Sequence, residues 1–125
     1  MNTKKEQSNI PADRLALYDD LIKTNPEIER KGVKLPYTSA DGNMFTFLSE
    51  NGTLAIRLPE TEREAFLKKY NASLMEAHGT VMKEYVRVPD GLWRNTKELK
   101  KYLHISYEHV KTLKPKAQKK KPSGK

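Results

Sequence analysis

The 125-residue sequence contains no cysteine, which excludes a disulfide scaffold, a thiol nucleophile and cysteine-ligated metals. Its beginning lacks the apolar core of an export signal, and no apolar run reaches membrane-spanning length. These absences favour a cytoplasmic protein with no membrane association. Hydrophobic residues make up 36% of the chain and are concentrated between its two ends, enough for one domain of about 100 ordered residues.

Acidic residues are missing from residues 111–125, which carry seven lysines and account for most of the net charge of +8. Residues 12–110 hold 15 basic and 15 acidic side chains and are neutral overall. The lysine-rich composition predicts a disordered tail, able to add weak, sequence-independent nucleic-acid affinity through counterion release. We therefore expect a disordered arm over residues 1–10, a single domain over 11–114 and a disordered tail over 115–125.

Hydrophobic periodicity predicts the elements of this domain. Apolar residues at helical spacing indicate helices near 12–24, 60–70 and 95–113, with a further turn over 27–30 and a weak point near 104–105. A Thr61-x-x-Glu64 capping box is expected to start the middle helix. Alternating or extended segments indicate five strands, over 33–37, 43–48, 53–58, 73–78 and 81–88.

The pairs Asp41-Gly42 and Asn51-Gly52 are typical of tight hairpin turns, so the first three strands form an antiparallel meander. Leu54, Ile56 and Leu58 alternate with Thr53, Ala55 and Arg57, which predicts one buried and one wet face for the third strand. The element order is α-β-β-β-α-β-β-α. It indicates a two-layer α+β domain with helices on one face of a five-stranded antiparallel sheet.

Enzyme signatures are absent: the sequence contains no Gly-x-Ser-x-Gly, His-Glu-x-x-His, Gly-x-Gly-x-x-Gly or phosphate-binding loop. His104 and His109 lie about 140° apart around a helix and cannot chelate from one face, and His78 has only Glu76 nearby. The acidic pairs fall on expected helix faces or first helical turns. We predict no catalytic residue, no metal site and no cofactor.

The sheet offers a candidate binding surface. In the last strand Met82, Glu84, Val86 and Val88 alternate with a second set of residues, which includes the basic Lys83 and Arg87 and the aromatic Tyr85. Two cations from earlier strands, Lys34 and Arg57, are expected beside this set. The predicted binding surface therefore consists of Lys34, Arg57, Lys83, Tyr85 and Arg87. Such a surface could hold phosphates or stack on bases. The alternative is an exposed sheet face whose cations pair with cross-strand acids. Glu84 would then be either buried with a partner or placed at a sheet edge.

Several segments resemble one family. Gly42-Asn43-Met44-Phe45-Thr46-Phe47, Gly52–Pro59, Val81–Val86 and the closing pattern from Leu99 to Lys116 resemble small proteins of the TfoX N-terminal-domain family, over roughly 12–116. The Arg-x-Met-Phe-Gly stretch typical of that family is replaced by Lys34-Leu35-Pro36-Tyr37. The resemblance implies a two-layer α/β fold with an antiparallel sheet, similar in architecture to YjbR/MmcQ-type proteins, and no catalytic residue.

Two functional hypotheses follow from the sequence. The first is a non-enzymatic, cytoplasmic binding or regulatory module that acts through an unknown protein partner. The second is a nucleic-acid-associated protein that uses the predicted basic surface together with the lysine-rich tail.

Overall fold

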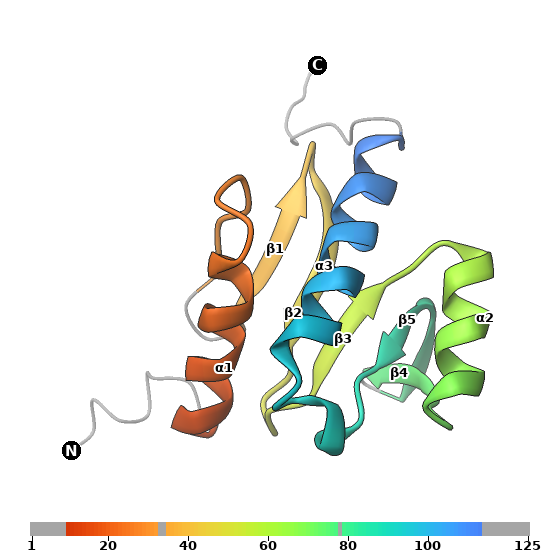
Figure 1. Cartoon of the computed structure of the whole chain (residues 1–125), viewed down its shortest axis with the longest axis horizontal. Coiled ribbons are helices and arrows are strands. Elements are labelled where there is room, and N and C mark those ends of the chain that lie inside the picture. Colours follow the sequence, from red (N-terminus) through yellow and green to blue (C-terminus); the bar gives the residue numbers. More distant parts are fainter. Residues whose placement is uncertain (1–9, 33–34, 78, 114–125) are drawn as a thin grey trace.

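The computed structural model describes residues 10–32, 35–77 and 79–113. It confirms the predicted α+β class and element order, with one additional 3₁₀ turn, η2. In chain order the elements are α1 (Ala12–Lys23), β1 (Tyr37–Ala40), β2 (Asn43–Leu48), β3 (Leu54–Arg57), α2 (Glu60–Lys69), β4 (Leu74–Ala77), β5 (Thr80–Arg87), η2 (Asp90–Leu92) and α3 (Thr96–Lys111) (Figure 1).

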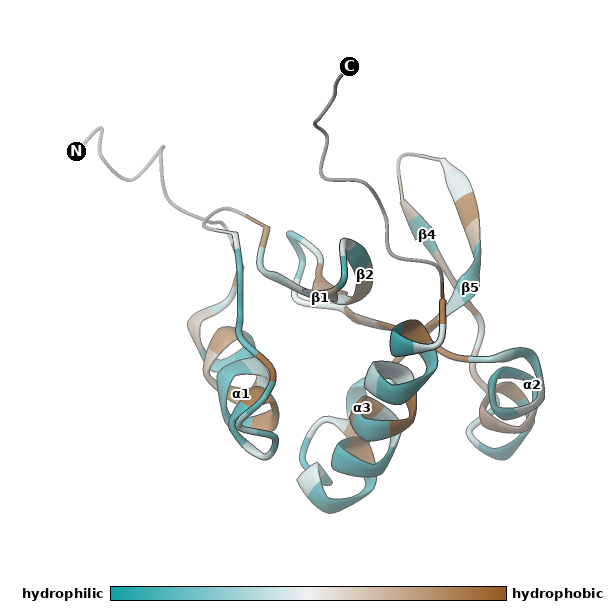
Figure 2. Cartoon of the chain, turned by 90° about the horizontal axis from the view of Figure 1, so that it is seen from above, coloured by the Kyte–Doolittle hydropathy of each residue, from teal (hydrophilic) through white to brown (hydrophobic). Residues whose placement is uncertain are grey.

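The five strands form one antiparallel sheet in the order β1-β2-β3-β5-β4. The three α-helices lie as a layer on one face of this sheet (Figure 1), and the β4–β5 hairpin rises on the opposite side (Figure 2). Asp41 and Gly42 both have positive φ, of 53° and 81°, which is the backbone of a type I′ hairpin turn. The face without helices is called the open face below.

The main core lies between the helix layer and the sheet. It includes Tyr18 from α1, Phe66 from α2, Leu99 and Leu103 from α3, and Ile56 from β3, all with at most 1% of their surface exposed. The buried hydroxyl of Tyr18 lies 2.7 Å from the Thr46 hydroxyl, which in turn lies 2.6 Å from that of Thr38. These two hydrogen bonds satisfy hydroxyl groups that would otherwise be costly to bury.

A register shift in β2 changes which side chains face the core. Thr38 pairs with Thr46 and Ser39 pairs with Met44, so Phe45 has no partner on β1. The side chain of Phe45 is fully buried against the helix layer, with its ring centroid 5.6 Å from that of Tyr107 in α3. Strict alternation would place Phe45 and Phe47 on the same face, but the shift places them on opposite faces.

Four local predictions were wrong. The first strand begins at Tyr37 and does not include Leu35 or Pro36, because Pro36 has no N–H for the ladder; residues 33 and 34 of the predicted strand lie outside the described residues. Its place at a sheet edge is as expected. Residues 27–30 form a turn and coil rather than a helical turn. The capping box is not formed, since α2 begins at Glu60 after Pro59 with no side-chain cap. The last helix is continuous through residues 104 and 105.

The predicted domain boundaries fall largely outside the described residues. The arm over 1–9 and the tail over 115–125 are not described, and neither is Lys34 or His78. Ile10, expected in the arm, is buried in the main core at 7% exposure. Among the described residues, no helix is both long and apolar enough to cross a membrane.

Candidate functional site

The open face of the sheet carries a second apolar cluster. Ala55 of β3, Met75 of β4 and Tyr85 of β5 are buried there, although none of the described helices covers this face (Figure 1). Met44, Phe47 and Met82 pack around them and are partly buried. The prediction that Thr53 and Ala55 would be wet is therefore wrong: both are buried, at 6% and 0% exposure.

Tyr85 holds this cluster together. Its hydroxyl donates a hydrogen bond of 2.7 Å to the backbone carbonyl of Met44, across 41 residues of chain. Its ring centroid lies 5.7 Å from that of Phe47. Burial raises the pKa of Tyr85, which keeps the hydroxyl protonated as a donor. Tyr85 is thus a buried member of this cluster rather than a ring free to stack on a ligand.

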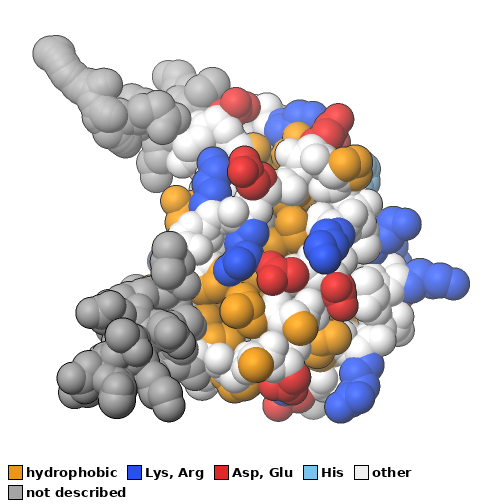
Figure 3. Space-filling view, turned by 90° about the vertical axis from the view of Figure 1, so that its left-hand side faces the viewer, with side chains coloured by type: hydrophobic (Ala, Val, Ile, Leu, Met, Phe, Trp, Pro, Cys, Tyr) orange, Lys and Arg blue, Asp and Glu red, His pale blue; other side chains and the backbone are white. Residues whose placement is uncertain are grey.

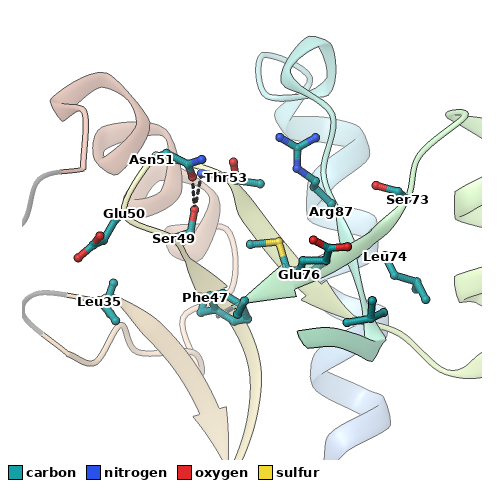
Figure 4. A pocket seen from close by; sticks show the side chains of 13 residues that line it. Leu35, Phe47, Ser49, Glu50, Asn51, Thr53, Ser73, Leu74, Glu76 and Arg87 are labelled. Carbon is teal, nitrogen blue, oxygen red and sulfur yellow. Dashed lines mark hydrogen bonds between the residues drawn. The ribbon is translucent and has the colours of Figure 1, made fainter. Parts of the chain in front are cut away.

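The open face is hollowed beside this cluster. The hollow has a volume of about 900 Å³. Phe47, labelled in Figure 4, and the buried Met75 form part of its floor. Among the described residues only Leu35 and Val81 are large apolar side chains with high exposure, at 49% and 44%, and both line this hollow. Apolar exposure in the described part of the chain therefore gathers at one place.

One wall of the hollow is the turn between β2 and β3. The Ser49 hydroxyl donates to the side-chain oxygen of Asn51 and accepts a bond of 3.1 Å from the Thr53 N–H. Gly52 completes this turn with a φ of 85°, and its carbonyl accepts a bond of 3.3 Å from Arg14 of α1. The wall is fixed by hydrogen bonds within the turn and by one from α1.

The opposite wall is formed by residues 73–77, five consecutive residues that include all of β4. Side chains of a strand alternate between the two faces of a sheet, so one face alone would contribute only alternate residues. A run of consecutive residues means that the edge of β4 itself opens into the hollow. The hollow thus joins an apolar floor to a strand edge.

Three charged residues lie on the rim: Glu50, Glu76 and Arg87. All three are exposed, and no ion pair within 4 Å joins any of them to another described residue. Figure 4 shows Glu50 on the side of Leu35 and Glu76 on the side of Arg87. Among the described residues, two acids and one base give the rim a net negative charge.

The predicted basic surface is only partly brought together. A shallower hollow of about 410 Å³ joins three of its residues, Arg57, Lys83 and Tyr85, whereas Arg87 lines the larger hollow and Lys34 lies outside the described residues. The Arg57 Nε and Nη2 atoms both lie 2.7 Å from Glu84 Oε1. Glu84 is exposed on an internal strand, so it is neither buried nor at an edge. Cross-strand pairing neutralises the cation at the centre of this surface.

The end of the molecule at which α1 lies has mixed charge (Figure 3). Acidic and basic side chains are interspersed over the face on which α1 lies (Figure 3). Glu98 of α3 accepts hydrogen bonds from the Tyr70 hydroxyl and from Lys69 Nζ, the latter at 3.1 Å. These two bonds, the tyrosine first, lower the pKa of Glu98 to about 2. Glu98 thereby links α2 to α3 as a structural acceptor.

Side chains suited to metal binding do not gather in the described part of the chain. No cluster of three or more His, Asp or Glu side chains there could hold a metal ion. His104 is exposed on α3, and burial lowers the pKa of His109 one turn further on.

Sequence reasoning missed the apolar members of the site. Met44 and Phe47 were assigned only to a strand, and Met82 was assigned to the face opposite Tyr85. The register between Leu74–Val86 and Met75–Met82 leaves residues 83–85 without partners on β4, which brings Met82 to the face of Tyr85. One signal could have identified these residues. It is the concentration of exposed apolar residues in strands that none of the described helices covers.

A comparison with models of known protein families gives one match. Residues 38–110 match the TfoX N-terminal domain. The matched region covers more than half of the 125-residue chain and extends from β1 into α3, so it contains the whole sheet except its first residue. No curated protein matches the sequence.

Proposed function

Because the chain belongs to the TfoX N-terminal domain family, we propose that it is a non-enzymatic binding module whose hollow on the open face docks a protein partner. The family assignment itself indicates a regulatory or binding module of a non-catalytic domain type. The proposal adds the place of contact and the class of partner.

The observation that carries the proposal is the apolar hollow on the open face. Soluble domains rarely leave apolar side chains gathered in one exposed place, and an apolar floor with a polar rim is typical of protein interfaces. Leu35 and Val81 lie at this hollow, with Phe47 and Met75 between the walls. A partner that covers these side chains removes apolar surface from water, which favours association.

A nucleic-acid partner fits the described surface less well. Phosphate binding requires unpaired cations gathered in one place. Arg57 is paired with Glu84, and Arg87 lies with Glu50 and Glu76 on the rim of the larger hollow, whereas Lys83 lines the shallower one. The ring of Tyr85 is buried and so offers no stacking platform. Nucleic-acid binding by this chain would therefore depend on the lysine-rich tail and be independent of sequence.

The protein-partner proposal is tested by capture from the source cell with single substitutions. Leu35→Asp and Val81→Asp place a charge in the hollow at exposed positions, whereas Ala65→Asp places the same charge on the exposed surface of α2. A partner retained by the wild type and Ala65→Asp but lost by both hollow variants supports the proposal. A partner retained equally by all four proteins refutes it.

The nucleic-acid alternative is tested by the salt dependence of binding to a duplex DNA of random sequence. The full chain is compared with Arg87→Ala and with a variant whose tail lysines are glutamine. We expect the tail variant to lose the binding and its salt dependence, and Arg87→Ala to leave both unchanged. The opposite result would favour a nucleic-acid site on the sheet.

A further inference from the structure

We propose that the protein partner binds as an extended segment that pairs with the free edge of β4, places apolar side chains over the hollow and carries Lys or Arg opposite Glu76. This inference rests on the proposed function, since it specifies how the same surface is used. Three observations support it: the difference between the two sheet edges, the direction of the backbone groups of β4, and the charge on the rim of the hollow.

The two edges of the sheet differ. At β1, the Lys31 N–H donates to the Tyr37 carbonyl at 2.7 Å, and the Tyr37 N–H donates to the Lys31 carbonyl at 2.9 Å. This bridge covers the beginning of β1. At the other edge, β4 pairs with β5 alone within the described residues. An uncovered edge presents a row of N–H and C=O groups that can template a further strand.

The backbone groups that face the free edge can be assigned. Arg87 N–H donates to the Ser73 carbonyl at 2.9 Å, so the polar groups of Ser73 point toward β5. In an antiparallel pair successive residues point alternately toward and away from the partner strand. Leu74 and Glu76 therefore direct their N–H and C=O groups away from β5, where an added strand would meet them.

The same edge opens into the apolar hollow. Residues 73–77 line it without interruption, and Phe47 and Met75 lie on its floor. Alternate side chains of a strand paired with β4 would point toward this floor, while its backbone would satisfy Leu74 and Glu76. Main-chain bonds for affinity and pockets for alternate side chains are the two components of recognition by strand addition.

The charge of the rim specifies the partner further. Glu76 lies on β4 itself and Glu50 on the opposite wall, and neither has an ion-pair partner among the described residues. A Lys or Arg directly across from Glu76 would form a favourable cross-strand pair, whereas an acid there would be repelled. Arg87 is the one base that lines the hollow among the described residues, so the acids are in excess there. The partner segment is therefore apolar and basic.

The test uses the full chain and a displayed library of random peptides about ten residues long, which exceeds the usual strand length. Enriched peptides are synthesised and their affinities measured by fluorescence anisotropy. The variants are Glu76→Pro, which removes both the outward N–H and the carboxylate, and Glu76→Lys, which reverses the charge but keeps the N–H. Glu29→Lys is the matched control in an exposed coil segment. Amide exchange of Leu74 and Glu76 is measured with and without peptide.

We expect the enriched peptides to alternate apolar residues with Lys or Arg and to slow exchange at Leu74 and Glu76. Glu76→Pro and Glu76→Lys should each weaken binding about tenfold or more, and Glu29→Lys should not. Because Glu76→Lys keeps the backbone intact, it remains decisive if the proline variant does not fold.

Other outcomes separate the two proposals. Peptides that bind Glu76→Pro and Glu76→Lys as well as the wild type, but lose affinity for Val81→Asp, would overturn strand addition and leave the docking function standing. Peptides insensitive to Glu76 and Val81 substitutions would overturn both. Enrichment of helical or acidic peptides, absence of any enriched peptide, or pairing of β4 with a second copy detected by sedimentation would overturn the proposed partner segment.

Discussion

Phe45 and Phe47 provide a direct test of the two faces of the sheet. They are identical residues two positions apart in β2, yet Phe45 is fully buried in the main core and Phe47 is partly buried on the open face. We predict that Phe45→Ala destabilises the protein much more than Phe47→Ala. The comparison controls for residue type, strand and unfolded-state effects.

The magnitudes follow from burial. Replacing a fully buried phenylalanine with alanine costs about 3–5 kcal/mol, because transfer energy is lost and a cavity remains. Phe47 loses only the contribution of a partly buried ring and its contact with Tyr85, together about 1–2 kcal/mol. The free energies of unfolding of the two variants should therefore differ by about 2–3 kcal/mol.

Urea unfolding measures this difference, and the only tryptophan, Trp93, is buried and serves as the fluorescent probe. With an m-value of about 2 kcal/mol per molar, the two midpoints should lie about 1 M apart. Phe45→Leu and Phe47→Leu form a milder pair if Phe45→Ala is unfolded in water. Equal midpoints, or a lower midpoint for the Phe47 variant, would refute the register shift that separates the two rings.

Three further measurements test other contacts. Glu98→Gln should destabilise the protein at neutral pH. The pKa of Glu98 is lowered from 4.5 to about 2 in the folded protein, where the ionised carboxylate is bonded to Tyr70. The ionised group therefore contributes stability above about pH 4.5, and this contribution is lost as the pH falls toward 2. Urea midpoints of the variant and wild type should converge over that window, and a constant difference would contradict the assignment. Gly52→Ala should lower the free energy of unfolding by about 1–2 kcal/mol, because φ at this position is 85°. Gly91→Ala, which has open space at its Cβ position, should lower it far less. Equal shifts in melting temperature for the two variants would show that the turn is unstrained. Tyr85→Phe should lower the free energy of unfolding by about 1 kcal/mol, because it removes the hydrogen bond to the Met44 carbonyl. An unchanged urea midpoint would show that this bond does not contribute to stability.

Much of the fold was predictable because local signals and long-range packing agree. The helix over Ala12–Lys23 and the strand over Asn43–Leu48 match the periodic segments almost residue for residue. Asp41-Gly42 forms the expected turn because positive φ suits that pair. The prediction was wrong at the first strand and at the capping box, where proline geometry and tertiary contacts override short patterns.

The candidate site was predictable only in part. Arg57, Tyr85 and Arg87 do share the open face, since Ala55 pairs with Arg87 and Arg57 pairs with Tyr85. Their roles could not be read from alternation, because the sequence does not show that Glu84 pairs with Arg57 or that Tyr85 bonds to β2. Both contacts join residues more than 25 positions apart in the sequence.

The sequence by itself determined the α+β class, the element order and the concentration of the +8 charge in residues 111–125, because these depend on local periodicity and composition. Only the tertiary structure decided what the open face is. The register shifts in β2 and β5 move Phe45 into the core and bring Met82 beside Tyr85, and strand order leaves the edge of β4 uncovered. Register and strand order are set by packing between distant segments, so the sequence did not show the apolar hollow, with Glu50 and Glu76 on its rim, that lies on the same face as the expected basic surface.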